Sequence, residues 1–244
     1  MTSPRTRIIR APYIIPLLCV LACALPSCKK KEGGEQLDRD SLLYTMYVKN
    51  HFISLYEKYM PATVTILTPG GANGNAPVGS GFFINDEGYI ITCRHVVAGR
   101  KTCSVMQGMT GKVWTAAVFH EDPAYDLALL KADFGRKKPD RLPHIPLSAD
   151  ARARTGSLYM AIGAPGGMKE TMLSGIVARD LRLNADPAMP GRSYVQLGGP
   201  VLPGSSGGPV LDMSGSVIGM MRFTLIAGGP VNGNSIDETI TINL

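Results

Sequence analysis

A serine pair bracketed by glycines stands near the C-terminus of the 244-residue chain, in Gly204-Ser205-Ser206-Gly207-Gly208-Pro209-Val210. Glycine permits positive φ angles and lets a backbone N–H approach a substrate oxygen closely, as an exposed nucleophile on a tight turn requires. The same composition is also common in ordinary turns between strands. This stretch alone therefore leaves two interpretations open, a nucleophile loop and a structural turn.

A serine hydroxyl becomes a good nucleophile when a histidine takes its proton, and that histidine needs a carboxylate to orient it. His95 follows an apolar run, so it stands where a strand gives way to a turn. Asp126 directly precedes the apolar run 127–130, which predicts a partly buried carboxylate able to bond a histidine. The other histidines are expected at the surface or in structural roles: His51, His120 and His144.

Three blocks of the chain resemble the HtrA (DegP/Deg) branch of the chymotrypsin-like serine proteases. They are Gly79-Ser80-Gly81-Phe82-Phe83-Ile84 with Thr92-Cys93-Arg94-His95-Val96-Val97, then Asp126-Leu127-Ala128-Leu129-Leu130-Lys131, then Gly204 to Val210. They are similar to the family's GSGFII…TNxHVV, DLALLK and GNSGGPL blocks. The runs 161–166 and 174–177 fall where the family has AIGNPxG and SGIVS. The similarity extends from about residue 60 to 240, and the order His, Asp, Ser is that of the chymotrypsin fold.

The resemblance implies a role for each residue. Ser206 would attack the scissile carbonyl, His95 would take and return the proton, and Asp126 would hold the imidazole in the correct tautomer. The backbone N–H groups of Gly204 and Ser206 would form the oxyanion hole. No metal, cofactor or metal-ligand cluster is expected, because hydrolysis by such a triad needs none.

Three departures from the family pattern bear on specificity and regulation. Gly198-Gly199-Pro200 stands where the family usually has Asp-Ala-Ala, so we expect a reshaped substrate pocket that takes a small or medium aliphatic P1 residue. Cys93 replaces the family's usual asparagine. The Gly- and Asn-rich stretch 226–236 corresponds to an activation-type loop. The sequence ends at Leu244, so we expect no PDZ domain.

The composition predicts an all-β body. With 28 Gly and 18 Pro, short apolar runs are separated by turns. The expected strands are 62–67, 79–84, 88–92, 103–106, 113–119, 127–130, 157–162, 172–178, 194–197, 209–211, 217–223 and 239–243, with a loop over 69–77. The prediction is a chymotrypsin-like double six-stranded β-barrel preceded by one N-terminal helix. The domains are expected at 29–60 (tether and amphipathic helix, 38–59), 61–135 (first barrel), 136–145 (linker) and 146–244 (second barrel).

The N-terminus is typical of an export signal over residues 1–28. A basic start is followed by an apolar stretch that is short and broken by prolines. Leu25-Pro26-Ser27-Cys28 resembles the bacterial lipobox, which implies lipidation of Cys28 and anchoring in the bacterial cell envelope, facing the periplasm or exterior. The alternative is an ordinary export signal with incidental cysteines.

The net charge bears on nucleic-acid binding, and the cysteine content bears on a possible disulfide. Of the formal net charge of +6, residues 1–50 carry +4, so the body is near neutral and nucleic-acid binding is not expected. In an oxidising compartment Cys93 and Cys103 could form a disulfide, and two buried thiols are an equal alternative.

These observations predict a serine endopeptidase that hydrolyses peptide bonds of unfolded or damaged envelope proteins. Its partners would be polypeptide substrates, the membrane through the lipid, and other copies of the chain, since trimers are frequent in the family. The alternative is a weakly active or inactive protease-fold protein that binds polypeptides in a chaperone-like way.

Overall fold

The computed structural model describes residues 39–69, 75–184, 190–199, 201–223 and 239–242. The predicted signal, Cys28 and the stretch 226–236 lie outside these residues. Within them, no helix has the length and the apolar character needed to cross a membrane.

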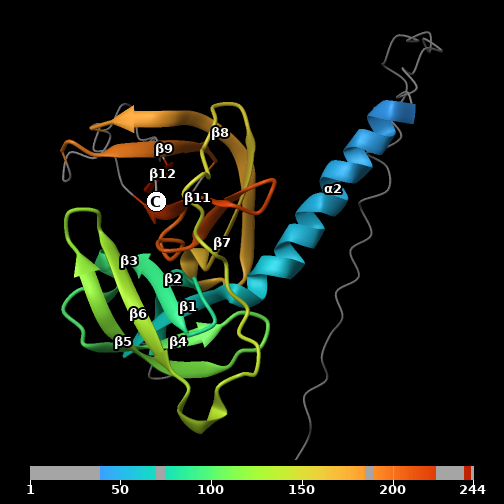
Figure 1. Cartoon of the computed structure of the whole chain (residues 1–244). Helices are drawn as coiled ribbons and strands as arrows, with labels where there is room; N and C mark the ends of the chain where they lie inside the picture. Colours follow the sequence, from blue (N-terminus) through green and yellow to red (C-terminus); the bar gives the residue numbers. More distant parts are fainter. Residues whose placement is uncertain (1–38, 70–74, 185–189, 200, 224–238, 243–244) are drawn as a thin grey trace, which may run out of the picture. The chain divides into compact units, whose positions relative to one another are not determined.

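Six antiparallel strands close the first barrel, in the order β1-β2-β3-β6-β5-β4 (Figure 1). They are β1 (Thr63–Pro69), β2 (Asn75–Phe83), β3 (Tyr89–Cys93), β4 (Thr102–Gln107), β5 (Val113–Asp122) and β6 (Leu127–Asp133). Strands β4 and β6 alternate buried and less buried side chains, as strands with one face in a core do. The predicted loop over 69–77 was too long, because β1 runs to Pro69 and β2 begins at Asn75.

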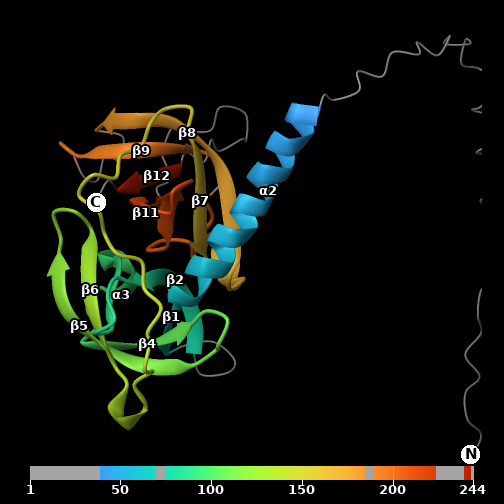
Figure 2. The ribbon, with the colours of Figure 1, turned by 45° about the vertical axis from the view of Figure 1, so that its right-hand side comes forward.

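The second barrel is also closed, in the order β10-β11-β12-β9-β8-β7. Its strands are β7 (Leu158–Gly163), β8 (Thr171–Leu183), β9 (Ser193–Gly198), β10 (Pro209–Asp212), β11 (Val217–Phe223) and β12 (Thr239–Ile242). Figure 2 shows the two barrels stacked against each other. The prediction of two six-stranded barrels is confirmed, and each of the twelve strands lies where an apolar run predicted it.

Helix α2 (Arg39–Tyr59) confirms the predicted N-terminal helix, which contains no glycine or proline and stops before Pro61 in the 3-10 turn η2 (Met60–Ala62). The chain divides into one unit that ends at Tyr44 and one that begins at Thr45, so only the helix from Thr45 onward is part of the barrel body. There, Leu55 and Tyr59 are buried. The predicted apolar face is covered in part, because Met46 and Tyr47 are more than half exposed.

The predicted linker 136–145 connects the barrels without being detached from them. After the 3-10 turn η3 (Gly135–Lys137), Leu142 and Ile145 are buried, and the Ile145 N–H donates to the Phe83 carbonyl at 2.8 Å. Its charged and proline-rich composition concealed these two apolar anchors, which pack the segment on the first barrel.

The larger of two core clusters joins the barrels. It combines first-barrel residues such as Phe82 and Phe83 with Met160, Ile162 and Met220 of the second barrel. Burial of this shared apolar surface favours one relative placement of the two barrels.

Of the two alternatives for Cys93 and Cys103, the structure has the pair of buried free thiols and not the disulfide. The reason is topological. Cys93 lies on β3, whose neighbours are β2 and β6, whereas Cys103 lies on β4, whose neighbours are β1 and β5. The two strands are never paired, although they follow each other in the sequence.

Candidate active site

Strand pairing places His95 and Asp126 side by side. β3 ends at Cys93 and is followed at once by the one-turn helix α3 (Arg94–Val97), which carries His95. Asp126 directly precedes β6, and β3 pairs with β6 so that Cys93 lies opposite Leu127. In this antiparallel pair Arg94 comes opposite Asp126, and His95 follows Arg94 in the first turn of α3, within reach of the Asp126 side chain.

Three hydrogen bonds hold the pair. The Nδ1 atom of His95 lies 2.6 Å from Oδ2 of Asp126, and the His95 backbone N–H donates to Oδ1 at 2.9 Å. The Arg94 N–H donates to the Asp126 backbone carbonyl at 2.8 Å. Because an ionised carboxylate only accepts hydrogen bonds, Nδ1 carries the proton and Nε2 is left as the basic nitrogen.

The environment keeps Asp126 ionised. Burial of this carboxylate, whose side chain is 8% exposed, raises its pKa, but the hydrogen bonds from His95 and Arg222 outweigh that effect and lower the pKa below its ordinary value. His95 is more open, with 47% of its side chain exposed. A buried anion beside an accessible imidazole is the arrangement that a general base requires.

The glycine-bracketed turn with Ser206 packs against the first barrel. The Ser206 carbonyl accepts a hydrogen bond from the Ser80 N–H at 2.8 Å, and the Gly207 N–H donates to the Met221 carbonyl at 2.8 Å. Gly207 has a φ of +91°, and a Cβ atom there would lie 2.0 Å from the Ser80 carbonyl oxygen. The glycine is therefore required by the close approach of two backbones as well as by its φ.

Ser80 ties both barrels to this turn, and sequence reasoning missed it. Its hydroxyl donates to the Gly204 carbonyl at 2.8 Å and accepts from the Ala164 N–H at 3.0 Å. Its own carbonyl accepts from the Thr92 hydroxyl at 2.6 Å. The only signal available was its place between two glycines in the first family-like block.

The peptide before Gly204 is oriented from the second barrel. The Gly166 N–H donates to the Pro203 carbonyl at 2.7 Å, and Gly204 has a φ of +96°. In a trans peptide the C=O and the N–H point in opposite directions, so this bond directs the Gly204 N–H away from Gly166. A fixed peptide plane is what an oxyanion-hole donor needs.

The predicted substrate-pocket residues are only partly described. Gly198 ends β9 and pairs with Ile176 of β8, Gly199 follows it, and Pro200 lies outside the described residues. A Cβ atom at Gly199 would lie 3.1 Å from the Tyr159 hydroxyl. The preference for an aliphatic P1 residue stays a prediction.

Arg222 is a second residue that the sequence did not point to. It lies on β11 of the second barrel with a side chain 12% exposed, and its Nε donates to Asp126 Oδ2 at 2.7 Å. Because Arg222 lies 96 positions from Asp126 and in no family-like block, only the packing of the barrels brings the two together.

Cys93, His95 and Asp126 also form a group whose ligand-type atoms lie within 4.8 Å of one another. No such cluster was expected from the sequence. Burial raises the pKa of the Cys93 thiol well above its ordinary value, so the thiolate that a metal requires is disfavoured. A cation would also have to displace the Arg222 guanidinium from Asp126. The residues therefore fit a hydrogen-bonded triad environment better than a metal site.

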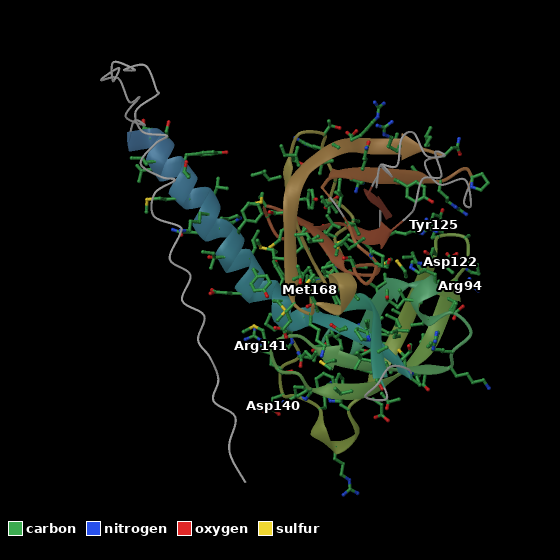
Figure 3. All side chains as sticks on the ribbon, turned by 180° about the vertical axis from the view of Figure 1, so that it is seen from behind. Arg94, Asp122, Tyr125, Asp140, Arg141 and Met168 are labelled. Atoms are coloured by element: carbon green, nitrogen blue, oxygen red, sulfur yellow. The ribbon has the colours of Figure 1, made fainter. Side chains whose placement is uncertain are left out.

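The three remaining histidines lie outside this group. His120 and His144 are exposed, as predicted, and His51 Nε2 contacts the Met213 carbonyl. Figure 3 shows Arg94, Asp122 and Tyr125, which flank His95 and Asp126 in sequence, gathered on the side of the first barrel that borders the second. In the same view, Asp140 and Arg141 of the connecting segment lie at the opposite edge of the first barrel from these three residues.

Comparison with known proteins agrees with this architecture. The family described as trypsin-like peptidase domain matches residues 79–220. The chain is 33% identical over 186 residues to the mitochondrial serine protease HTRA2 of Bos taurus, a match that covers 73% of this chain and 40% of that protein. It is 36% identical over 143 residues to a probable periplasmic serine endoprotease, DegP-like, of Brucella suis, covering 58% of this chain and 26% of that protein.

Among solved structures, the HtrA-type protease AlgW with tripeptide is similar with a TM-score of 0.65 and 26% identity, covering 79% of this chain and 59% of that chain. The chain thus spans 26% to 40% of the length of the two curated relatives named above. The region that the family model matches, residues 79–220, includes the three family-like blocks and most strands of both barrels. The chain therefore belongs to the trypsin-like serine peptidases, and within them to the HtrA type.

Proposed function

We propose that this chain is a serine endopeptidase in which His95, Asp126 and Ser206 form the catalytic triad. The observation that carries the proposal is the 2.6 Å contact between His95 Nδ1 and the buried Asp126 carboxylate, with the Ser206 turn hydrogen-bonded to the same barrel. Family membership gives this geometry its meaning, since the same pair in an unrelated fold could be a structural ion pair.

The chemistry follows from the protonation states. Ser206 Oγ attacks the scissile carbonyl while His95 Nε2 takes its proton, and the imidazolium that forms is stabilised by Asp126. The tetrahedral oxyanion is bound by the N–H groups of Gly204 and Ser206, each donor contributing on the order of 10²–10³ in rate. His95 then protonates the leaving amine, and a water molecule repeats the sequence to release the acyl group.

The substrates we propose are polypeptides, specifically unfolded or damaged proteins of a bacterial envelope. The name of the DegP-like relative places that protein in the periplasm, and the lipobox-like sequence before Cys28 is consistent with an envelope location for this chain. We propose lipidation at Cys28 and, by analogy with the family, assembly into trimers.

Active-site labelling tests the triad directly. A fluorophosphonate probe should label the wild-type protein and not Ser206→Ala, and wild-type protein should degrade casein whereas the variant should not. Ser205→Ala is the matched control, because it removes the neighbouring hydroxyl and should stay labelled. Equal labelling of wild type and Ser206→Ala would reject the assignment. Casein binding without cleavage by the wild type would indicate the chaperone-like alternative.

Membrane fractionation tests the anchor. Cys28→Ser should move the protein from the membrane to the soluble fraction of the bacterial envelope, while Cys19→Ser, within the apolar stretch, should leave it membrane-bound. An unchanged distribution of Cys28→Ser would reject lipidation at this residue.

A further inference from the structure

One oxygen of the Asp126 carboxylate accepts hydrogen bonds from residues of both barrels. Oδ2 accepts from His95 Nδ1 at 2.6 Å on the first barrel and from Arg222 Nε at 2.7 Å on the second. Both the carboxylate and the guanidinium are largely buried, with side chains 8% and 12% exposed. A charge-assisted hydrogen bond in such surroundings is screened far less by water and salt than a surface ion pair.

We propose that Arg222 is a positioning residue of the triad, which clamps Asp126 from the opposite barrel and competes with the His95 imidazolium for the same carboxylate oxygen. The inference rests on the proposed function, and it adds to it a residue that lies in none of the family-like blocks.

The positioning part follows from where Arg222 is attached. The carbonyl of the neighbouring residue Met221 accepts two hydrogen bonds. One comes from the N–H of Gly207, next to the proposed nucleophile, and the other from the Cys93 thiol at 3.4 Å. Residues 221 and 222 of β11 therefore contact both the serine turn and the carboxylate. A displacement of about 1 Å between such groups can lower a rate on the order of 100-fold.

The pH part follows from charge. The imidazolium that forms on His95 is stabilised by Asp126, but Arg222 already places a positive charge on the same oxygen. Two like charges that share one counterion each weaken the other's stabilisation. Removal of the Arg222 charge should therefore strengthen the interaction between the imidazolium and Asp126, and a change in the pH dependence of the rate is the expected sign of it.

Within the described residues, the charged and titratable groups that act on the Asp126 carboxylate come from three elements: His95 on α3, Arg222 on β11 and the Cys93 thiol on β3. Arg192, just before β9, lies over the ring of the adjacent Tyr125 at 4.1 Å. Arg94 is neutralised by Glu121 at 2.9 Å. Among the described residues, Arg222 is the permanently charged group that bonds the Asp126 carboxylate directly, at 2.7 Å.

The test is the pH dependence of the rate at which the fluorophosphonate labels Ser206, because this rate depends on His95 as a base and needs no known substrate. Arg222→Met keeps an unbranched side chain that reaches about as far as Nε and removes the guanidinium and its charge. We expect the acidic midpoint of the labelling rate to move up by about one pH unit and the plateau rate to fall about 10-fold.

Two further variants separate charge from hydrogen bonding. Arg222→Lys keeps the charge, so its midpoint should stay near that of the wild type, while Arg222→Gln can still donate a hydrogen bond without charge and its midpoint should move as in the Met variant. Arg182→Met is the matched control, since Arg182 donates to Gln196 at 2.7 Å on the exposed side of the second barrel. Its profile should match the wild type.

The results separate a failure of the proposed function from a failure of the role proposed for Arg222. If wild-type Ser206 is not labelled, the proposed function fails before Arg222 is tested. If the wild type is labelled and the midpoints of the folded Gln and Lys variants coincide with it, Arg222 has only a structural role and the inference is overturned. If Arg222→Met does not fold, as judged by circular dichroism, the Gln and Lys pair still makes the comparison.

Discussion

The two barrels contribute to the candidate site in different ways. The first barrel supplies His95 and Asp126 through one strand pair, β3 with β6, and thus through contacts within a single sheet. The second supplies Ser206 and Arg222 from the turn before β10 and from β11, and each reaches the first barrel through hydrogen bonds across the interface. The proposed base and its carboxylate are thus brought together within one sheet, whereas the position of the proposed nucleophile depends on how the two barrels pack.

The two barrels also differ in how densely their side chains are packed. The first barrel encloses an aromatic cluster in which Trp114 stands edge-on to Phe134 at 5.2 Å and to Phe83 at 6.4 Å. In the second barrel, the last residues of β8, from Ala178 onward, are exposed. Dense cores resist distortion, so we expect the His95–Asp126 pair to tolerate substitutions in the interface better than the Ser206 turn does.

The largest effect should come from within the first barrel. Asp126→Asn should lower kcat/KM on the order of 10⁴-fold, because an amide can donate to Nδ1 and so favours the wrong tautomer of His95. Casein or peptide hydrolysis measures it. Asp133→Asn is the control, since Asp133 only caps the Gly135 N–H at 2.8 Å on the surface. A loss of less than 10-fold for Asp126→Asn would contradict the triad.

The second largest effect should come from Gly207→Ala, a substitution at the interface between the two barrels. The added Cβ would lie 2.0 Å from the Ser80 carbonyl oxygen and 2.3 Å from the Thr92 hydroxyl, at a φ of +91°. We expect a loss of labelling at Ser206 of about 100-fold or more and a loss of unfolding free energy of about 3 kcal/mol.

Gly191→Ala separates the effect of backbone strain at a positive φ from the effect of a steric clash. Gly191 has a φ of +79° but no atom within 4 Å of a Cβ built there. This variant should cost only about 1 kcal/mol and keep its activity. Thermal unfolding and labelling rates compare the two, and equal losses would show that backbone strain alone, rather than docking of the barrels, decides the effect.

Ser80→Ala should have an intermediate effect. It removes the hydroxyl shared by the Gly204 carbonyl and the Ala164 N–H and leaves both without that partner, at a cost of about 1–3 kcal/mol. Labelling at Ser206 should slow about 10-fold while the His95–Asp126 pair stays intact. The comparison variant is Ser157→Ala, whose exposed hydroxyl bonds the Arg154 carbonyl at 2.7 Å. Unchanged labelling in Ser80→Ala would show that the turn does not need this clamp.

The smallest effect concerns acid stability. The folded-state pKa of Asp126 is lowered from an ordinary value of 3.8, so its stabilising contribution is present above that pH and is lost as pH falls through the folded-state pKa. The difference in unfolding free energy between wild type and Asp126→Asn should therefore shrink below about pH 4. Urea unfolding followed by the fluorescence of Trp114, the single tryptophan, measures it. A difference that grows towards acid would contradict the sign.

The strand series, the N-terminal helix and the candidate residues His95, Asp126 and Ser206 could all be predicted from the amino-acid sequence. These signals are local. Apolar runs between turn residues specify strands, and the family-like blocks carry the catalytic residue types in their own few positions. The buried segment at Leu142 and Ile145 escaped this reasoning because its surroundings read as a polar linker.

Which distant groups complete the site could be seen only once the chain was folded. Barrel closure separates Cys93 from Cys103 and joins β3 to β6. Docking of the barrels places the Ser80 hydroxyl on the Gly204 carbonyl, 124 positions away, and Arg222 on Asp126. Such contacts leave no periodicity or spacing in the sequence, because each depends on the register of whole sheets and on the shared core that holds the two barrels together.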